Sequence, residues 1–226
     1  MGMLNFTSLV LFPSLLHDLR GYPDTVIGNL IAARGLGNWI AFLFIAQLTR
    51  IAPRTAIAAG LAIQALGGYW MAQFDINVDE ASIFWSHLLM GLGQSVSFTP
   101  MTVMAFTTLP KHKITEGSAV FTMMRNFGSS LFISLAVLVL VRSTSANYSR
   151  MAEFISPYRE ALVLSGLPTS WSPETATGLL QISKEVHRQS AMIGYVNCFY
   201  LMALTAALAV PLACFLRNPP RDSQPA

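Results

Sequence analysis

The sequence predicts an all-α integral membrane protein in which six transmembrane helices form one bundle. Hydrophobic residues make up 53% of the 226 residues and charged residues only 11%, far below the roughly 25% charge of an average soluble domain. Six apolar segments approach or exceed the about 20 helical residues that cross a hydrocarbon core. Most Lys and Arg residues lie at the ends of these segments, so the net charge of +3 indicates membrane topology rather than nucleic-acid binding.

The first segment, at about 2–16, is short, contains Pro13 and has no basic residue before it. A secretory signal peptide needs a basic start and a small-residue cleavage site, and neither is clear here. We therefore interpret this segment as a span whose beginning is missing. The second and third segments are expected at about 25–48 and 54–74.

The fourth segment, at about 82–109, has the densest pattern of small residues. Gly91 with Ser95, and Gly93 with Ser97, form two small-xxx-small pairs that allow another helix to approach closely. Pro100 removes a backbone hydrogen bond and predicts a kink. Similar packing positions are expected in two other segments, at Gly35, Gly37 and Gly128.

The fifth segment, at about 115–142, is followed by a long connection, 143–189, for which we expect short amphipathic helices outside the membrane. Within this connection, Ser172 as N-cap, followed by Pro173, predicts a helix that leads into the last segment. That last segment, at about 190–216, precedes a short tail, 217–226. Its two cysteines, Cys198 and Cys214, are sixteen residues apart along one predicted helix, too far for a disulfide.

The short connections differ in charge, and this difference predicts the orientation. The second connection carries Arg50 and Arg54 and the fourth carries Lys111 and Lys113, whereas the third has three acids and no basic residue. By the positive-inside rule, the second and fourth connections and both termini are cytoplasmic. The predicted location is the bacterial inner membrane.

Two arginines, Arg34 and Arg125, lie about ten residues inside the second and fifth segments, while all eleven Asp and Glu residues lie in connections or at segment edges. An arginine at the centre of a helix costs roughly 2.5–3.5 kcal/mol on insertion scales. Snorkelling, a water-filled cavity or an acid elsewhere in the assembly would compensate this cost. We favour a partner outside this chain, a carboxylate or an anionic substrate group. Gln94 and Asn126 add amides to the same predicted path.

The sequence gives little support for catalysis or metal binding. The four histidines are scattered without a metal-binding spacing, and no acid lies near a candidate nucleophile inside a span. We therefore expect no enzyme, no metal and no cofactor. His87, near the start of the fourth segment, is expected at the membrane interface, where water satisfies it, rather than in a proton relay.

Four stretches also carry a family resemblance, and together they cover nearly the whole chain. They resemble, in the right order, the C-terminal half of major facilitator drug:proton antiporters of the EmrB/QacA type, which have fourteen spans. The stretches are GYPDTVIGNLIAARGLGNWIAFLFIAQLTRIAPR, GLGQSVSFTPMTVMAFTTLP, EGSAVFTMMRNFGSSLFIS and HRQSAMIGYVNCFYLMAL.

The family motifs fall on residues already singled out. The arginine-glycine-x-glycine motif corresponds to Arg34, Gly35 and Gly37, and the arginine-asparagine-x-glycine motif to Arg125, Asn126 and Gly128. The glycine-x-glycine motif with a downstream proline corresponds to Gly91, Gly93 and Pro100, and the cytoplasmic gate loop to Arg50 and Arg54. Two departures concern Gln47 and Thr49, where relatives often have Gly and Asp, and Asn197 and Cys198, where many relatives have acids.

The resemblance implies proton-driven efflux of hydrophobic or amphipathic drugs by alternating access, with this chain as one half of the transporter. The implied partners are the lipid bilayer, a missing N-terminal bundle, the substrate and, in Gram-negative relatives, a periplasmic adaptor that the long external connection would contact. Three alternatives remain open: an inactive truncated fragment, a facilitator for metabolites or siderophores, and a non-transport membrane protein that assembles helices through its glycine faces.

Overall fold

All regular structure in the described part of the chain is helical. The computed structural model describes residues 2–107, 109–155 and 175–215. Its helices are α1 (Gly2–Arg20), α2 (Asp24–Ile51), α3 (Pro53–Met71), α4 (Glu80–Thr107), a 3-10 turn (Lys111–Lys113), α5 (Ile114–Ala152) and α7 (Ala176–Cys214). The predicted all-α fold with six long helices is therefore confirmed.

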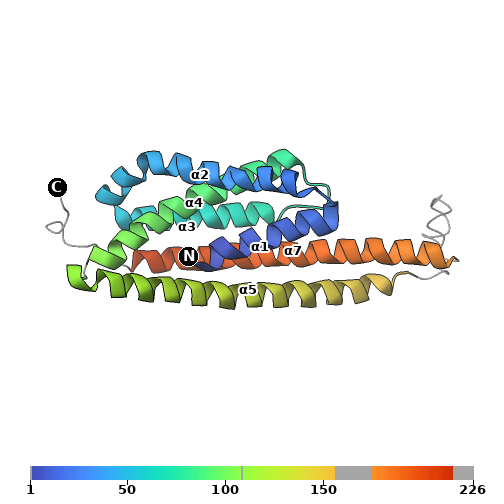
Figure 1. Cartoon of the computed structure of the whole chain (residues 1–226). Helices are drawn as coiled ribbons and strands as arrows, with labels where there is room; N and C mark the ends of the chain where they lie inside the picture. Colours follow the sequence, from blue (N-terminus) through green and yellow to red (C-terminus); the bar gives the residue numbers. More distant parts are fainter. Residues whose placement is uncertain (1, 108, 156–174, 216–226) are drawn as a thin grey trace.

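The helices pack in two layers (Figure 1). Two long antiparallel helices, α5 and α7, form one layer with α1 lying along them, while α2, α3 and α4 form the other. Helix α4 packs against both α2 and α3, and α3 also packs against α7. The core between the layers is built from large buried apolar side chains, among them Phe12, Met71, Ile83, Phe199 and Met202.

Both long helices continue beyond the predicted spans. Helix α5 runs ten residues past position 142, and α7 begins fourteen residues before position 190, which adds about 15 and 20 Å of helix. In Figure 1 these ends project beyond the other four helices. We call this segment, 143–152 with 176–189, the α5–α7 hairpin. Helix bounds are not membrane bounds, so the predicted span limits stay predictions.

The start of α7 has a well-defined cap. The Thr175 side chain accepts a hydrogen bond from the backbone nitrogen of Gly178 at 3.1 Å, which satisfies one of the free amides of the first turn. The predicted N-cap, Ser172, lies outside the described residues. The expected short helix and the last span are therefore one continuous helix from Ala176 onward.

The connection between α2 and α3 is only one residue long. Helix α2 continues to Ile51 and α3 begins at Pro53, with Ala52 between them. Proline has no backbone N–H and disfavours a helical conformation in the residue before it, which explains why α2 ends here. The predicted gate loop thus consists mainly of the last turn of α2 and the first turn of α3.

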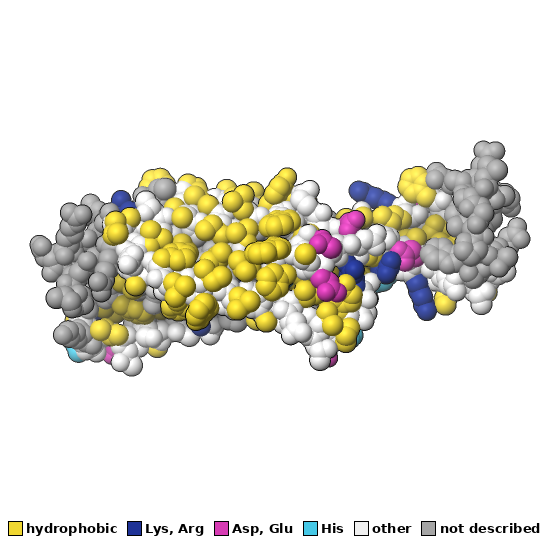
Figure 2. Space-filling model, turned by 90° about the horizontal axis from the view of Figure 1, so that it is seen from above, with side chains coloured by type: hydrophobic (Ala, Val, Ile, Leu, Met, Phe, Trp, Pro, Cys, Tyr) yellow, Lys and Arg dark blue, Asp and Glu magenta, His cyan; other side chains and the backbone are white. Residues whose placement is uncertain are grey.

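Apolar side chains cover much of the outer surface. Figure 2 shows them over the face that α2 presents, where Trp39, Phe42 and Leu43 are exposed. This apolar area ends where acidic side chains gather, near the end of the bundle from which the α5–α7 hairpin projects. An exposed apolar area of this size bounded by charged groups is typical of a surface in contact with lipid.

Three of the described helices are long and apolar enough, by length and composition alone, to cross a membrane. These are α2, α5 and α7, over Asp24–Thr49, Ile114–Ala152 and Ala176–Ala213. Buried polar residues lower the hydropathy of α3 and α4, for example Gln64 on α3 and Ser86 and Ser97 on α4. These polar groups lie inside the bundle, where they do not contact lipid.

Candidate functional site

Helix α4 crosses its two neighbours at points where only glycine fits. A Cβ atom added to Gly91 would overlap the backbone carbonyl of Arg34 on α2, and one added to Gly37 would overlap the carbonyl of Leu88 on α4. On the other side of α4, a Cβ at Gly93 would lie 2.8 Å from the carbonyl oxygen of Gly60 on α3. The backbones of three helices therefore touch at the centre of this layer.

The two small-xxx-small pairs of α4 face different helices. Gly91 and Ser95 face α2, because the Ser95 hydroxyl donates to Asn38 Oδ1 at 2.9 Å. Gly93 and Ser97 face α3, because Gln64 Nε2 donates to Ser97 Oγ at 2.8 Å. Pro100 is buried, and α4 continues past it to Thr107. Of the other packing positions, Gly35 is exposed and Gly128 is half-buried.

Arg34 is buried inside this chain, with only 5% of its surface exposed. Its Nε donates to Gln94 Oε1 on α4 at 3.0 Å, and its Nη1 to the Ser8 hydroxyl on α1 at 3.4 Å. One guanidinium thereby joins α1, α2 and α4. These acceptors are neutral oxygens of the same bundle, and the expected anionic partner outside this chain stays a prediction.

His87 is also buried, with 1% exposure, so the expectation of an interfacial histidine in contact with water is wrong. Its Nδ1 lies 3.1 Å from the carbonyl oxygen of Ile83, one turn earlier in α4. Its ring packs edge-on against Phe12 of α1, with 4.3 Å between the ring centroids. The side chain therefore contributes to the contact between α1 and α4.

Arg125 differs from Arg34 because its guanidinium has no hydrogen-bond or ion-pair partner among the described residues. Its Nε is buried and unsatisfied. The guanidinium carbon lies 5.9 Å from the centroid of the Phe98 ring on α4, within the range of a cation–π contact. Phe121 packs against both Phe98 and Phe106, at centroid distances of 6.4 and 5.6 Å. An unpaired cation thus lies beside an aromatic cluster between α4 and α5.

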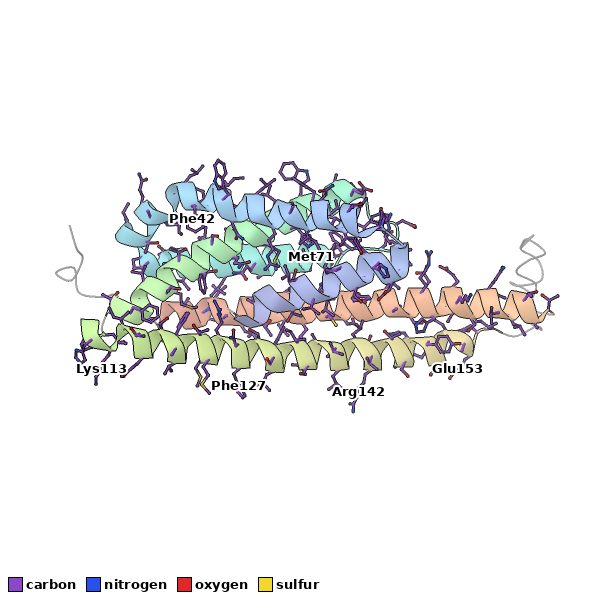
Figure 3. The ribbon with its side chains drawn as sticks, in the orientation of Figure 1. Phe42, Met71, Lys113, Phe127, Arg142 and Glu153 are labelled. Atoms are coloured by element: carbon purple, nitrogen blue, oxygen red, sulfur yellow. The ribbon has the colours of Figure 1, made fainter. Side chains whose placement is uncertain are left out.

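Helix α5 presents a largely open face around Arg125. Within this helix, the described side chains that are buried are Ser129, Phe132 and Ala136. Asn126 is exposed next to Arg125. Figure 3 shows Phe127 on the side of α5 that points away from α7. Between positions 120 and 131 of that helix, the exposed large apolar side chains are Val120, Met123, Met124, Phe127 and Leu131. Arg125 itself is half-buried beside Phe98 of α4, next to a part of α5 that the described residues leave exposed.

The predicted gate residues flank the single-residue connection between α2 and α3. Arg50 lies in the last turn of α2, and its side chain is outside the described part. Arg54 lies in the first turn of α3, where its Nε is buried and has no hydrogen-bond partner in the described part of the chain. On α2, the Thr49 hydroxyl donates to the carbonyl of Ile45 at 2.7 Å.

Asn197 and Cys198, which the sequence analysis singled out as departures from the family pattern, contribute to the contact between α5 and α7. Asn197 Nδ2 donates to the Ser143 hydroxyl at 2.6 Å, and the Cys198 thiol lies 3.1 Å from the carbonyl of Ala136. Among the residues searched, which exclude the uncertain segments, no group of three or more His, Cys, Asp or Glu side chains is arranged to hold a metal.

Comparisons with known proteins place these features in a family context. The sequence profile of the Major Facilitator Superfamily matches residues 1–156. The chain is 24% identical over 229 residues to the multidrug export protein EmrB of Haemophilus influenzae and 23% identical over 224 residues to EmrB of Escherichia coli K12. It is 23% identical over 235 residues to the fatty acid resistance protein FarB of Neisseria gonorrhoeae.

These alignments cover 96–98% of this chain but only 43–44% of each relative. The chain therefore spans less than half the length of the relatives that it matches. This extent agrees with the resemblance to the C-terminal half of an EmrB-type protein, and the predicted family resemblance is confirmed.

Proposed function

Because this chain belongs to the Major Facilitator Superfamily, we propose that it forms one six-helix bundle of a transporter that exports hydrophobic or amphipathic toxic compounds. The names of its relatives, multidrug export and fatty acid resistance proteins, support this substrate class. The family points to a transporter rather than an enzyme. Together with its apolar helices it indicates a multi-pass protein of the inner membrane.

The unpaired Arg125, half-buried between α4 and α5, carries the proposal. An arginine inside a span costs roughly 2.5–3.5 kcal/mol, and such residues mark substrate or ion pathways. The partner of Arg125 is a carboxylate of a second bundle or an anionic group of the substrate. Asn126, exposed beside it, supplies an amide to the same path.

A second bundle accounts for the open face of α5. Major facilitators consist of two six-helix bundles with the substrate cavity at the midplane between them. The apolar side chains around Phe127 would be covered by that bundle, which corresponds to length that the relatives have and this chain lacks. Arg34 has a different role in this arrangement, because its hydrogen bonds to Gln94 and Ser8 hold the wall of the cavity together.

The connection at Ala52 is the proposed cytoplasmic gate. Arg50 and Arg54 lie on either side of it and supply the positive charge that the positive-inside rule places in the cytoplasm. With one residue between them, α2 and α3 move together when the bundle rocks. Gate closure would then bring these arginines to acidic groups of the second bundle.

The proton gradient is the proposed energy source, with no bound cofactor. Ten of the eleven acidic residues of this chain lie outside the predicted spans, and Glu116 lies at the very start of the fifth, so the carboxylates that carry protons would belong to the second bundle. The α5–α7 hairpin projects on the side assigned to the outside and is the proposed contact for a periplasmic adaptor protein.

Dye export tests the proposed function. We expect an efflux-deficient strain that expresses the complete gene product to accumulate severalfold less ethidium than the same strain with an empty vector. An uncoupler that collapses the proton gradient should restore accumulation, because export then loses its driving force. Equal accumulation in both strains would contradict drug export and favour a metabolite or siderophore facilitator, an inactive fragment or a helix-assembly protein.

A further inference from the structure

A pocket of about 630 Å³ lies at the base of the α5–α7 hairpin, where the last turn of α1 meets α5 and α7. Its lining includes Asp18 on α1, Leu140, Thr144 and Tyr148 on α5, and His187 and Tyr195 on α7. The volume falls within the range of about 300–1,000 Å³ that is typical of sites for drug-sized molecules. The pocket is too large for an inorganic ion and differs from the Arg125 region in both location and charge.

A chain of hydrogen bonds fixes the one carboxylate of this lining. The Ser14 hydroxyl donates to Asp18 Oδ2 at 2.8 Å, and the Tyr195 hydroxyl lies 2.9 Å from Ser14 Oγ. Because the single Ser14 proton is used toward Asp18, Tyr195 is the donor to Ser14. Tyr195 is 4% exposed, so this series of hydrogen bonds runs from the core to the mouth of the pocket.

Aromatic rings supply the opposite wall. Tyr148 and His187 pack edge to face with 6.0 Å between their centroids, and the Tyr148 hydroxyl is held by Ser183 at 2.9 Å. Leu140 adds apolar surface deeper in the pocket. Tyrosine faces attract cations, and an apolar floor favours a ligand with a hydrocarbon or aromatic body.

The positive charges near the pocket are compensated elsewhere. Arg188 pairs with Glu185 on its own helix at 3.0 Å and donates to the carbonyl of Leu19. Arg20 donates to the carbonyl of Val78 and lies over the ring of Tyr22. Figure 3 shows Arg142 on the side of α5 that points away from α7. Asp18 is therefore the one charged group of the lining that none of these arginines pairs with, and His17, whose Nδ1 lies 3.0 Å from Asp18 Oδ1, is the basic group next to it.

We propose that this pocket binds a monovalent organic cation with an aromatic or aliphatic body, whose charge lies at Asp18 and whose body packs against Tyr148. This inference rests on the proposed function, in which the pocket would be a binding site for compounds on their way out of the cell. The 58% exposure of the Asp18 side chain lets the ligand charge keep part of its water, so binding and release need no buried ion pair.

Equilibrium binding of tetraphenylphosphonium to the protein in lipid nanodiscs tests the site, with empty nanodiscs as the blank. We expect saturable binding that Asp18→Asn weakens by about tenfold, the scale of one ionic contact near a protein surface. Glu80→Gln removes an exposed acid in the first turn of α4 that does not line the pocket, and it should leave the affinity unchanged. Tetraphenylborate, an anion of the same shape, should not compete.

The outcomes separate the site from the function. Equal loss in Asp18→Asn and Glu80→Gln, or no loss in either, would overturn the site, as would competition by tetraphenylborate. Tyr148→Ala should also weaken binding, whereas Tyr148→Phe keeps the ring and should retain it. Because the assay uses no gradient, binding without ethidium export would contradict the proposed function alone, and export with unchanged Asp18→Asn binding would contradict the site alone.

Binding should weaken as the pH falls from 8 to 6. The hydrogen bond to Asp18 and its charge raise the pKa of His17 above its usual 6.5, and the bonds from His17 and Ser14 lower the pKa of Asp18. Asp18 thus stays ionised over this range, while His17 gains a proton and neutralises it. His187 on α7 also lines the pocket, Asp24 on α2 acts on His17, and Glu185 is paired with Arg188.

The expected change is a severalfold loss of tetraphenylphosphonium affinity, beginning above pH 6.5 because the pKa of His17 is raised. His17→Gln should make the pH dependence clearly smaller. If the affinity of the His17→Gln protein falls with pH as steeply as that of the unmodified protein, protonated His17 does not compete with the ligand cation for Asp18.

Discussion

Replacing Gly37 by alanine is expected to destabilise the bundle strongly, whereas the same change at Gly35, two residues earlier, should be tolerated. A Cβ at Gly37 would overlap the carbonyl of Leu88 on α4, while nothing lies within 4 Å of a Cβ at Gly35. Overpacking of this kind costs typically about 1–3 kcal/mol. Both substitutions gain up to about 1 kcal/mol of helix propensity, so their difference isolates the contact between α2 and α4.

Thermal unfolding in detergent, followed by size-exclusion chromatography, measures this difference. We expect Gly37→Ala to lose its monodisperse peak many degrees below the unmodified protein, and Gly35→Ala to keep it. Similar behaviour of the two variants would show that α2 and α4 do not cross at Gly37. If Gly35→Ala stays stable but no longer transports, Gly35 belongs to the contact with the second bundle.

Replacing Arg125 by alanine is expected to abolish most transport without unfolding the protein. The guanidinium has no hydrogen bond to lose among the described residues, and its contact with Phe98 is worth about 0.5–2 kcal/mol at most. Removing an unpaired charge from apolar surroundings offsets that loss. Transport should nevertheless fall by about tenfold or more, because charges inside spans serve substrate or ion pathways.

Ethidium efflux and thermal stability should be measured on the same samples. Arg142→Ala is the matched control, since Arg142 is an exposed arginine on the same helix that points away from the bundle. It should change neither quantity. Unchanged efflux in Arg125→Ala would remove the central support for a transport pathway at α5. A large loss of stability would instead show that Arg125 is a structural residue.

Hydropathy and small-residue spacing predicted the six helices and the close approach of α4 to its neighbours. They did not predict that the Gly91 and Gly93 pairs face different helices. The reason is geometric: the two glycines are two residues apart, about 200° around a helix, and so they lie on nearly opposite faces. The two-residue spacing therefore implies that the pairs face opposite sides of α4, but it does not tell which helix lies on each side.

The sequence was least informative about the partners of buried polar residues. The sequence showed Arg34 as a buried charge with no carboxylate nearby in the chain to pair with it. In the structure its hydrogen-bond acceptors are the neutral oxygens of Gln94, sixty residues away, and Ser8. Such pairs depend on how the helices pack, which periodicity does not specify. His87 was misplaced for the same reason, because α1 covers it with Phe12. For Arg125, the prediction that it has no partner in the chain agrees with the described residues.

The continuous α5–α7 hairpin has a practical consequence. Both helices run from the bundle core to its projecting end without a break in the described residues. A tilt of the bundle would therefore move the projecting ends of both helices with it. Spin labels or fluorophores at the hairpin would therefore report the alternation that we propose for the assembled transporter. With the orientation that we propose, an antibody fragment bound to the same projecting ends would inhibit transport without crossing the membrane.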